Sequence, residues 1–252
     1  MSEDITVVMS GYKRPFTTAE QYESIKKQTI KDVDILFWIN FPPDSSSGFP
    51  LDIVNNCKTI LTQQNFGVWG RFVQALQLET EYVCIIDDDT IPGDMWLENC
   101  LETMKTHEGV LTTRGVEVYK DRKEQYPISG SYQAFGWCNP NETVKRVDIG
   151  CHSWFFRKNW LRAFFADMPN KLPKNYGEDI HLSASIKRHL GYNTYVPPHP
   201  KNNKRMWGSH PDKATEYGHI NAISLDGINN KGMNIYWNHA LNNLKYKILQ
   251  EE

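Results

Sequence analysis

The sequence predicts a single α/β domain with a mostly parallel central sheet and helices on both faces. The chain has 252 residues, of which 40% are hydrophobic and 23% charged, as in one ordinary globular domain. In its first half, short apolar runs of strand length alternate with helical patterns. This alternation is typical of parallel strands joined by crossover helices, so it predicts the Rossmann-like arrangement.

The first half contains four strand-length runs, of which the last is the most regular. These are residues 5–9, 35–39, 57–61 and 82–86. Thr17 and Glu20 form a capping box, which predicts a helix from Thr17 to about Gln28. Two further helices are expected over residues 70–78 and 94–106. The first, third and fourth strands are thus each followed by a helix that can return the chain to the same edge of the sheet.

The second half is less regular. The expected strands are residues 110–113, 144–149 and 192–196, and the expected helices are residues 159–165 and 178–190. Gly191 follows the second helix in the position that favours a left-handed residue. Residues 198–234 are polar, so we expect an irregular loop that acts as a lid. A final helix carries an apolar stripe of Tyr236, Ala240, Leu244 and Ile248.

Composition excludes several classes of partner. The net charge is −2 and the isoelectric point is near 6.5, which does not suit a nucleic acid polymer. No apolar run approaches the roughly 20 residues of a transmembrane segment, and the first residues do not read as a leader peptide. The five cysteines are widely spaced without a paired motif, which favours a reducing, cytoplasmic location.

Three consecutive aspartates follow the fourth strand. In an open α/β sheet, ligands bind beyond the carboxyl ends of the strands, where Asp87, Asp88 and Asp89 lie. In an extended chain Asp87 and Asp89 point to one side and Asp88 to the other. Two carboxylates on one side form a hard oxygen site for Mg²⁺ or Mn²⁺, so we favour a metal site over a solvated acidic turn.

A wider pattern resembles a known family. An apolar strand ending in D-x-D follows an Asn-x-Gly segment at residues 65–67 and precedes a Glu-Asp pair at residues 178–179. Over about residues 5–200 this resembles the GT-A fold glycosyltransferases, especially family 2 and small enzymes of bacteria and large DNA viruses. The resemblance implies transfer of a sugar from a UDP- or GDP-linked donor to a hydroxyl of a glycan or glycoconjugate. It also implies an Mn²⁺ or Mg²⁺ cofactor.

The resemblance divides the single domain into three parts. Residues 1–106 bind the nucleotide sugar, residues 107–200 bind the acceptor, and residues 201–252 form the C-terminal loop and helix. In the first part, the second aspartate of D-x-D binds the metal and the first faces the donor ribose beside it. By resemblance, Asp89 and Asp87 take these roles, and Asp87 also counts as a metal ligand. Asp88 stays a donor-binding candidate because two alignments are possible.

The remaining donor-binding candidates lie at strand ends and in the loops after them. The loop after the first strand supplies Ser10, Tyr12, Lys13 and Arg14; the second strand ends at Asn40; the Asn-x-Gly segment and the helix after it supply Asn65 and Arg71. Lys13 or Arg14 can meet phosphate or base, and Arg71 can pair with Asp87 or with phosphate. Relatives often have an acid in place of Asn40, so the identity of the base stays open.

The acceptor side supplies the expected base. An inverting transfer needs a carboxylate that takes the proton of the attacking hydroxyl. By resemblance, Asp179 is this base and Glu178 supports it or contacts an acceptor hydroxyl. Residues 148–157 resemble the strand beneath the acceptor, which makes Asp148 and Trp154 acceptor-binding candidates, while we interpret His152 as a local histidine. His199 lies where some relatives place a third metal ligand.

Two other classes of protein and one other stereochemical outcome stay open at this point. A sugar-nucleotide nucleotidyltransferase shares such a sheet, but it normally carries a longer glycine-rich loop after the first strand. A non-catalytic sugar-binding module needs neither the aspartate triplet nor the second carboxylate pair. A retaining transferase also fits, because one fold can host both outcomes.

Overall fold

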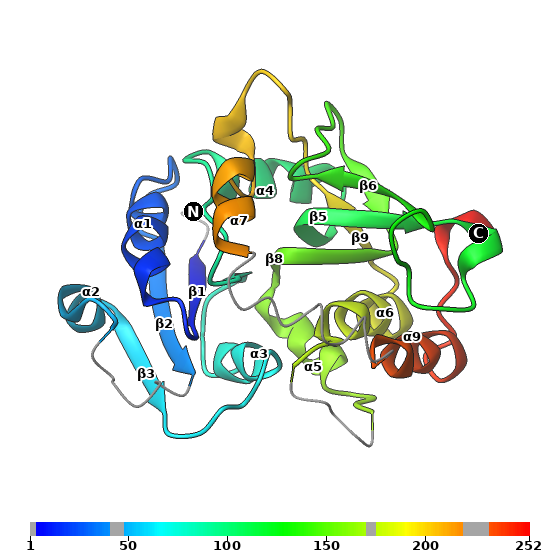
Figure 1. The fold of residues 1–252 in the computed structure, drawn as a ribbon, viewed down its shortest axis with the longest axis horizontal. Coiled ribbons are helices and arrows are strands. Elements are labelled where there is room, and N and C mark those ends of the chain that lie inside the picture. Colours follow the sequence, from blue (N-terminus) through cyan, green and yellow to red (C-terminus); the bar gives the residue numbers. More distant parts are fainter. Residues whose placement is uncertain (1–3, 41–47, 170–174, 219–231) are drawn as a thin grey trace.

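The computed structural model describes residues 4–40, 48–169, 175–218 and 232–252, which form an α/β fold around one sheet (Figure 1). The strands follow the order β3-β2-β1-β4-β8-β5-β9-β7, and β6 pairs with β5. Their bounds are β1 Ile5–Gly11, β2 Asp34–Asn40, β3 Lys58–Thr62, β4 Tyr82–Ile86, β5 Gly109–Val118, β6 Tyr132–Gly136, β7 Lys145–Val147, β8 Ile149–Arg157 and β9 Asn193–Val196.

The sheet has a parallel half and a mixed half. Strand β1 pairs in parallel with β2 and β4, and β2 pairs in parallel with β3. Strand β8 then runs antiparallel to both β4 and β5, while β9 lies parallel to β5. Six of the seven residues of β1 are buried, because helices cover the sheet on both sides. The predicted fold class is confirmed.

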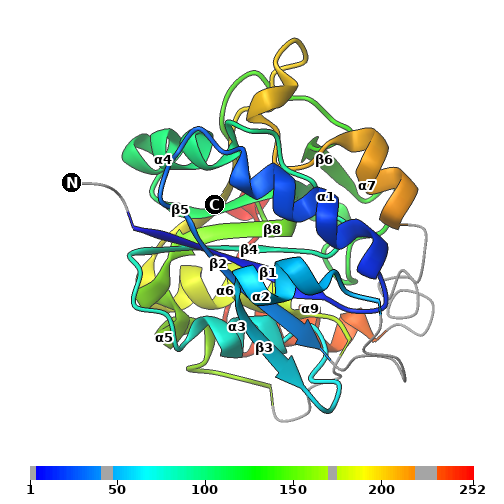
Figure 2. The same cartoon turned by 90° about the vertical axis from the view of Figure 1, so that its left-hand side faces the viewer.

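Helices lie on both faces of the sheet, with α1 and α4 on one face and α3, α5, α6 and α9 on the other (Figure 2). The α-helices are α1 Pro15–Lys26, α2 Leu51–Asn56, α3 Gly70–Ala75, α4 Trp96–Thr106, α5 Leu161–Phe164, α6 Glu178–Leu190, α7 Pro211–Gly218 and α9 Met233–Asn242. Four 3₁₀ turns are η1 Lys120–Arg122, η2 Lys158–Trp160, η3 Lys204–Met206 and η4 Leu249–Glu251. Within the described residues, no helix is long and apolar enough to cross a membrane.

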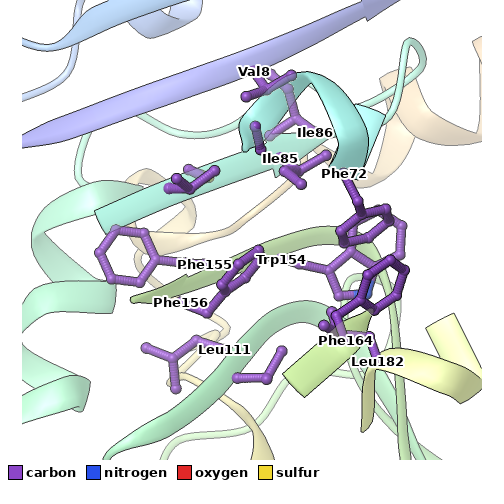
Figure 3. Packing of buried hydrophobic residues seen from close by; sticks show 14 of the residues in the cluster. Val8, Phe72, Ile85, Ile86, Leu111, Trp154, Phe155, Phe156, Phe164 and Leu182 are labelled. Carbon is purple, nitrogen blue, oxygen red and sulfur yellow. The ribbon is translucent and has the colours of Figure 1, made fainter. Parts of the chain in front are cut away.

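Aromatic rings fill the layer between the sheet and the helices α3, α5 and α6. Figure 3 shows Phe72 and Phe164 beside Trp154 of β8. The ring centroids of Phe72 lie 4.4 Å from Phe164 and 5.8 Å from Trp154, and all three side chains are buried. Fully burying one such ring is worth about 1.5–3 kcal/mol, so this cluster gives the sheet a rigid base. Arg71 of α3 directly precedes Phe72, and its guanidinium lies over the rings of Phe72 and Trp154.

Several elements differ from the sequence-based expectation. Residues 198–234 contain helix α7, whose Tyr217 packs edge-on against Phe16 of α1 at 5.8 Å. The expected strand at 144–149 is divided into β7 and the longer β8, which turn at Asp148. The final helix ends at Asn242 although its apolar stripe stays buried. Residues 219–231 of the expected loop lie outside the described residues.

Candidate functional site

A cavity of about 810 Å³ opens at the carboxyl ends of β1, β2 and β4. Open α/β sheets bind their ligands at this edge. Ser10, Asn40 and Asp87 line the cavity from the parallel half of the sheet. His152 and Glu178 line it from β8 and the start of α6. The cavity therefore joins the parts of the chain that the sequence assigns to donor and acceptor.

Helix α1 and strand β8 hold the backbone of the aspartate triplet. Gln21 Nε2 donates to the carbonyl oxygen of Asp87 at 2.7 Å, and Thr17 Oγ1 donates to that of Asp88 at 2.7 Å. The amide of Asp87 donates to the carbonyl oxygen of His152 at 3.0 Å. Thr17 thus does not cap α1, which begins two residues earlier. Its hydroxyl positions the aspartates instead, which corrects the capping-box prediction.

The triplet concentrates negative charge in a poorly hydrated place. Arg14 lies 2.5 Å from an oxygen of Asp88 and 3.4 Å from one of Asp89. Burial raises the pKa of Asp88 to about 7, although Arg14 lowers it, and the charges of Asp89 and Asp87 raise it further. One arginine therefore does not offset the repulsion among these carboxylates, and an additional cation would stabilise them.

Arg71 connects the triplet to helix α6. Its guanidinium forms an ion pair with Asp87 on one side and with Glu178 on the other. The same group lies 4.5 Å above the ring of Trp154, so it is held from below by a cation–π contact. Arg71 is 5% exposed. It therefore fixes the distance between the aspartate triplet and the Glu-Asp pair.

Asp87, Asp89 and His152 form a candidate metal centre. One ligand atom from each lies within 4.8 Å of the other two. Asp89 Oδ1 is buried without a hydrogen-bond partner, and burial raises the pKa of this carboxyl group. An unpaired buried carboxylate oxygen is costly unless a cation meets it. Two carboxylates suit Mg²⁺ or Mn²⁺, to which the imidazole adds a nitrogen ligand, so the residues fit a divalent ion.

Sequence analysis missed His152 because strand pairing brings it to the site. Ile86, the last residue of β4, lies opposite Ser153 of the antiparallel strand β8. This register places His152 beside Asp87, one step beyond the end of β4. His152 also has a left-handed backbone, with φ of 71°, which is uncommon outside glycine and typical of functional sites. Its spacing from other ligands along the chain gives no such signal.

Glu178 and Asp179 open helix α6 behind Gly177. Gly177 has φ of 95°, and a Cβ atom there would lie 2.2 Å from the ring of Tyr236. Burial, together with the charge of the adjacent Glu178, raises the pKa of Asp179 to about 8. Both carboxylates line the cavity, but Glu178 is paired with Arg71, whereas Asp179 accepts a hydrogen bond only from the amide of Ile180, at 2.8 Å, among the interactions described. A carboxylate of raised pKa in a cavity can accept a proton from a ligand.

Comparison with known proteins identifies the family. A family model described as Glycosyl transferase family 2 matches residues 6–165, which include most of the sheet and the aspartate triplet. The chain belongs to glycosyl transferase family 2. The family resemblance found in the sequence is thereby confirmed. No curated protein sequence matches the chain.

Solved structures with a similar fold include TarS from S. aureus. Residues 1–349 of TarS match with a TM-score of 0.52 and 18% identity, covering 77% of this chain and 60% of that one. The same fragment in complex with UDP matches with a TM-score of 0.55 and 18% identity, covering 98% of this chain and 76% of that one. A further TarS structure matches with a TM-score of 0.54 and 17% identity, and the match covers 36% of that chain. At 17–18% identity these likenesses show a shared fold, and the chain spans less than two thirds of the first and the third of these TarS chains.

Most of the remaining donor candidates line the cavity near the carboxyl ends of β1 and β2. Asn40 Nδ2 donates to Asn65 Oδ1 at 3.0 Å, and Asn65 Nδ2 donates to the hydroxyl of Tyr12 at 3.1 Å. Ser10 Oγ is buried without a hydrogen-bond partner and also lines the cavity. Lys13 is not among the lining residues, and its ammonium lies 5.1 Å from the Tyr12 ring. The structure therefore brings together all of these candidates except Lys13.

Three other candidates do not present free groups to the cavity. His199 is fully buried; its Nδ1 hydrogen-bonds a carbonyl at 2.8 Å and its Nε2 accepts an amide proton at 3.1 Å. Asp148 is also fully buried and accepts hydrogen bonds from Val118 and Leu249, both at 2.8 Å. Trp154 reaches the cavity only as the floor beneath Arg71. His152 therefore replaces His199 as the third candidate ligand, and Asp148 has a structural position.

Proposed function

We propose that the protein is an inverting, divalent-metal-dependent glycosyltransferase that moves one sugar from a nucleoside-diphosphate donor to a hydroxyl of a glycan or glycoconjugate. One observation carries this proposal. The candidate metal ligands Asp87, Asp89 and His152 line the same cavity as Asp179. Arg71 joins the two groups through its ion pairs with Asp87 and Glu178. The cavity thus offers both a diphosphate-binding end and a proton acceptor.

The donor side would hold Mn²⁺ or Mg²⁺ on Asp87, Asp89 and His152. When bound, such an ion neutralises the negative charge that develops on a departing diphosphate. Arg71 holds Asp87 in position, since its guanidinium binds that carboxylate directly. The amides of Asn40 and Asn65 and the hydroxyl of Tyr12 form the end of the cavity where we place the base of a UDP- or GDP-linked sugar.

The acceptor side would use Asp179 as the general base. An acceptor hydroxyl is nearly all protonated at neutral pH, so its attack on the anomeric carbon requires a nearby carboxylate. Glu178 cannot take this role while it is paired with Arg71, so we assign it to positioning. Direct displacement with Asp179 as base forms the new bond on the face opposite to the departing diphosphate. The product would therefore have the inverted anomeric configuration.

Donor binding is tested first by thermal shift. UDP and GDP are added with and without Mn²⁺, beginning with UDP because a TarS fragment of similar fold was solved with it. Ligand at about 100 times its dissociation constant adds roughly 2.7 kcal/mol, which raises the melting temperature by roughly 2–4 °C per kcal/mol. Asp89→Asn should lose the metal-dependent part of this rise. The control Asp94→Asn, at an exposed ion pair with Arg205, should keep it.

Catalysis is tested by comparing Asp179→Asn with Glu178→Gln. Asparagine cannot accept the proton, so Asp179→Asn should lower transfer by roughly 10²–10⁴-fold while nucleotide binding is retained. Glu178→Gln should lower it less if Glu178 only positions other groups. The anomeric configuration of the product is measured by NMR. A retained configuration, or full activity of Asp179→Asn, would show that the base assignment is wrong.

A further inference from the structure

Beyond the metal centre and the base, the cavity has a third group of polar side chains, on the β5–β6 hairpin. Arg114 of β5, Tyr132 of β6 and Trp137 directly after β6 all line the cavity. The guanidinium of Arg114 lies 5.2 Å from the Trp137 ring, and its NH2 donates to the Tyr132 hydroxyl at 3.4 Å. We call these three residues the hairpin group. None of the three belongs to the candidate metal centre or to the Glu-Asp pair of α6.

The backbone of the hairpin is irregular where it carries this group. The register of β5 against β8 shifts between Thr112 and Arg114, which is the mark of a β-bulge. Gly136 and Trp137 both have left-handed backbones, with φ of 74° and 40°. Bulges re-aim side chains, and a tryptophan with positive φ is held there at an energetic cost. Both irregularities aim the Arg114 and Trp137 side chains into the cavity.

The positive charge of the hairpin group is not paired directly with a carboxylate of the described residues. Two other arginines of the cavity are neutralised, Arg14 by Asp88 and Arg71 by Asp87 and Glu178. Among the residues that the structure describes, Arg114 has no carboxylate partner, and its one hydrogen bond goes to a tyrosine hydroxyl. A cation facing a cavity without a counter-charge favours an anionic ligand.

The two polar atoms of the hairpin group that lack a partner in the described structure are both hydrogen-bond donors. Arg114 Nε and Trp137 Nε1 are covered from solvent, and neither has a hydrogen-bond partner in the described structure. Both atoms only donate, so only an acceptor can satisfy them. Carboxylate and phosphate groups supply several acceptor oxygens and a negative charge, which arginine binds through paired donors. The hairpin group therefore suits an oxyanion better than a neutral sugar.

The location of the hairpin group favours an acceptor, rather than the donor, as the ligand that carries the oxyanion. Trp137 packs on His152 with ring centroids 4.6 Å apart, so the group borders the candidate metal centre. Arg114 lies opposite Cys151, the residue before His152, in the pairing of β5 with β8, and Asp179 lines the same cavity. A ligand bound by Arg114 would therefore lie in the cavity that holds both the candidate metal ligands and the proposed base.

We infer that Arg114, with Tyr132 and Trp137, is a specificity site for an acceptor that carries a carboxylate or phosphate group close to the reacting hydroxyl. This inference rests on the proposed function, because it takes Asp179 to mark the acceptor side. It adds the chemical class of the acceptor. A phosphate of the donor shares the same chemistry, so the experiment has to separate the two sources.

The experiment measures binding of simple anions to protein saturated with UDP and Mg²⁺. The probes are methyl glucuronide, glucose 6-phosphate and, as the neutral reference, methyl glucoside. Wild type should bind one or both anions at least about tenfold more tightly than the glucoside. Arg114→Gln should remove this preference, Arg114→Lys should keep part of it, and Trp137→Phe should weaken it. The control Arg205→Gln removes an equal charge at an exposed pair with Asp94 and should change nothing.

Each alternative outcome has a distinct meaning. The inference is wrong if wild type binds neither anion better than methyl glucoside, or if Arg114→Gln keeps the preference. A weaker affinity of Arg114→Gln for UDP, with the anion preference unchanged, would assign Arg114 to the donor diphosphate. The titrations are repeated without nucleotide, so anion binding can be measured even if wild type binds no nucleotide. A wild type that binds the anions but no nucleotide would contradict the proposed function and still support the anion site.

Discussion

Arg71→Met tests how the two carboxylate groups of the site are held together. Arg71 pairs with both Asp87 and Glu178, and the side chains of Arg71 and Glu178 are only 6% and 8% exposed. Methionine has a similar length and can still pack on the ring of Trp154. The substitution therefore removes the charge while keeping most of the volume. It leaves two carboxylates without their shared cation.

The expected loss of stability is large because Glu178 stays buried. Removing one partner of a buried ion pair costs about 3–5 kcal/mol, since the remaining charge is uncompensated. Asp87 is 26% exposed and partly screened by water, so Glu178 carries most of this cost. For a chain of this size, the loss corresponds to a fall in melting temperature of roughly 6–20 °C.

The loss should also depend on pH. Burial raises the pKa of Glu178, and Arg71 lowers it, so Arg71→Met raises the pKa of the folded state further. A carboxyl group whose pKa is raised by folding stabilises the folded state below its unfolded value of about 4.3. That contribution is lost as the pH rises through the folded value. Arg71→Met should therefore be more destabilising at pH 8 than at pH 5.

The assay is urea denaturation of the wild type and variant at both pH values. Arg157→Met serves as a matched control, because Arg157 pairs with Glu81 and Glu108 at the surface and should cost less than about 1 kcal/mol. Adding Glu178→Gln to Arg71→Met should restore part of the stability. A loss below about 1 kcal/mol, or an equal loss at pH 5 and pH 8, would refute the reasoning.

Three further predictions follow from single residues. Since only the ionised base accepts a proton, kcat/KM of wild type should rise with pH up to about 8, the value to which burial raises the pKa of Asp179. A flat pH profile would contradict this. Asp148→Ala should destabilise by about 2 kcal/mol or more in urea denaturation, because it leaves the backbone amides of Val118 and Leu249 unpaired. A loss below about 1 kcal/mol would show that water replaces the carboxylate. Gly177→Ala should lower the melting temperature and impair nucleotide binding, because the added Cβ atom would lie 2.2 Å from the Tyr236 ring. A variant with the melting temperature and nucleotide affinity of wild type would contradict the left-handed conformation of Gly177.

The fold of the first half could be predicted from local sequence. Strands β1, β2 and β4 are short apolar runs, and parallel strands buried on both faces leave this pattern directly in the chain. The aspartate triplet was found by the same reasoning, because it directly follows a recognisable strand. The Glu-Asp pair was found by its resemblance to a family motif and by the glycine in front of it. All of these signals lie within a few consecutive residues.

The second half was harder to predict because its strands pair antiparallel over long separations. Strand β6 is half-exposed and pairs with β5, and the break at Asp148 divides one expected strand into two. Helix α7 has few apolar residues, and it is positioned by contacts of Tyr217 with Phe16 and Glu20 of α1. Contacts of this kind leave no periodic pattern in the sequence.

The sequence alone predicted the family, the parallel half of the sheet and the carboxylates that line the cavity, because each of these depends on residues that are neighbours in the chain. The choice between His152 and His199 as a candidate ligand depended on the pairing of β8 with β4, which brings one histidine to Asp87 and leaves the other fully buried. The division of roles between Glu178 and Asp179 likewise depended on Arg71, which reaches Glu178 from another helix. Charge compensation and access to a cavity are properties of distances in space, and those distances exist only once the chain has folded.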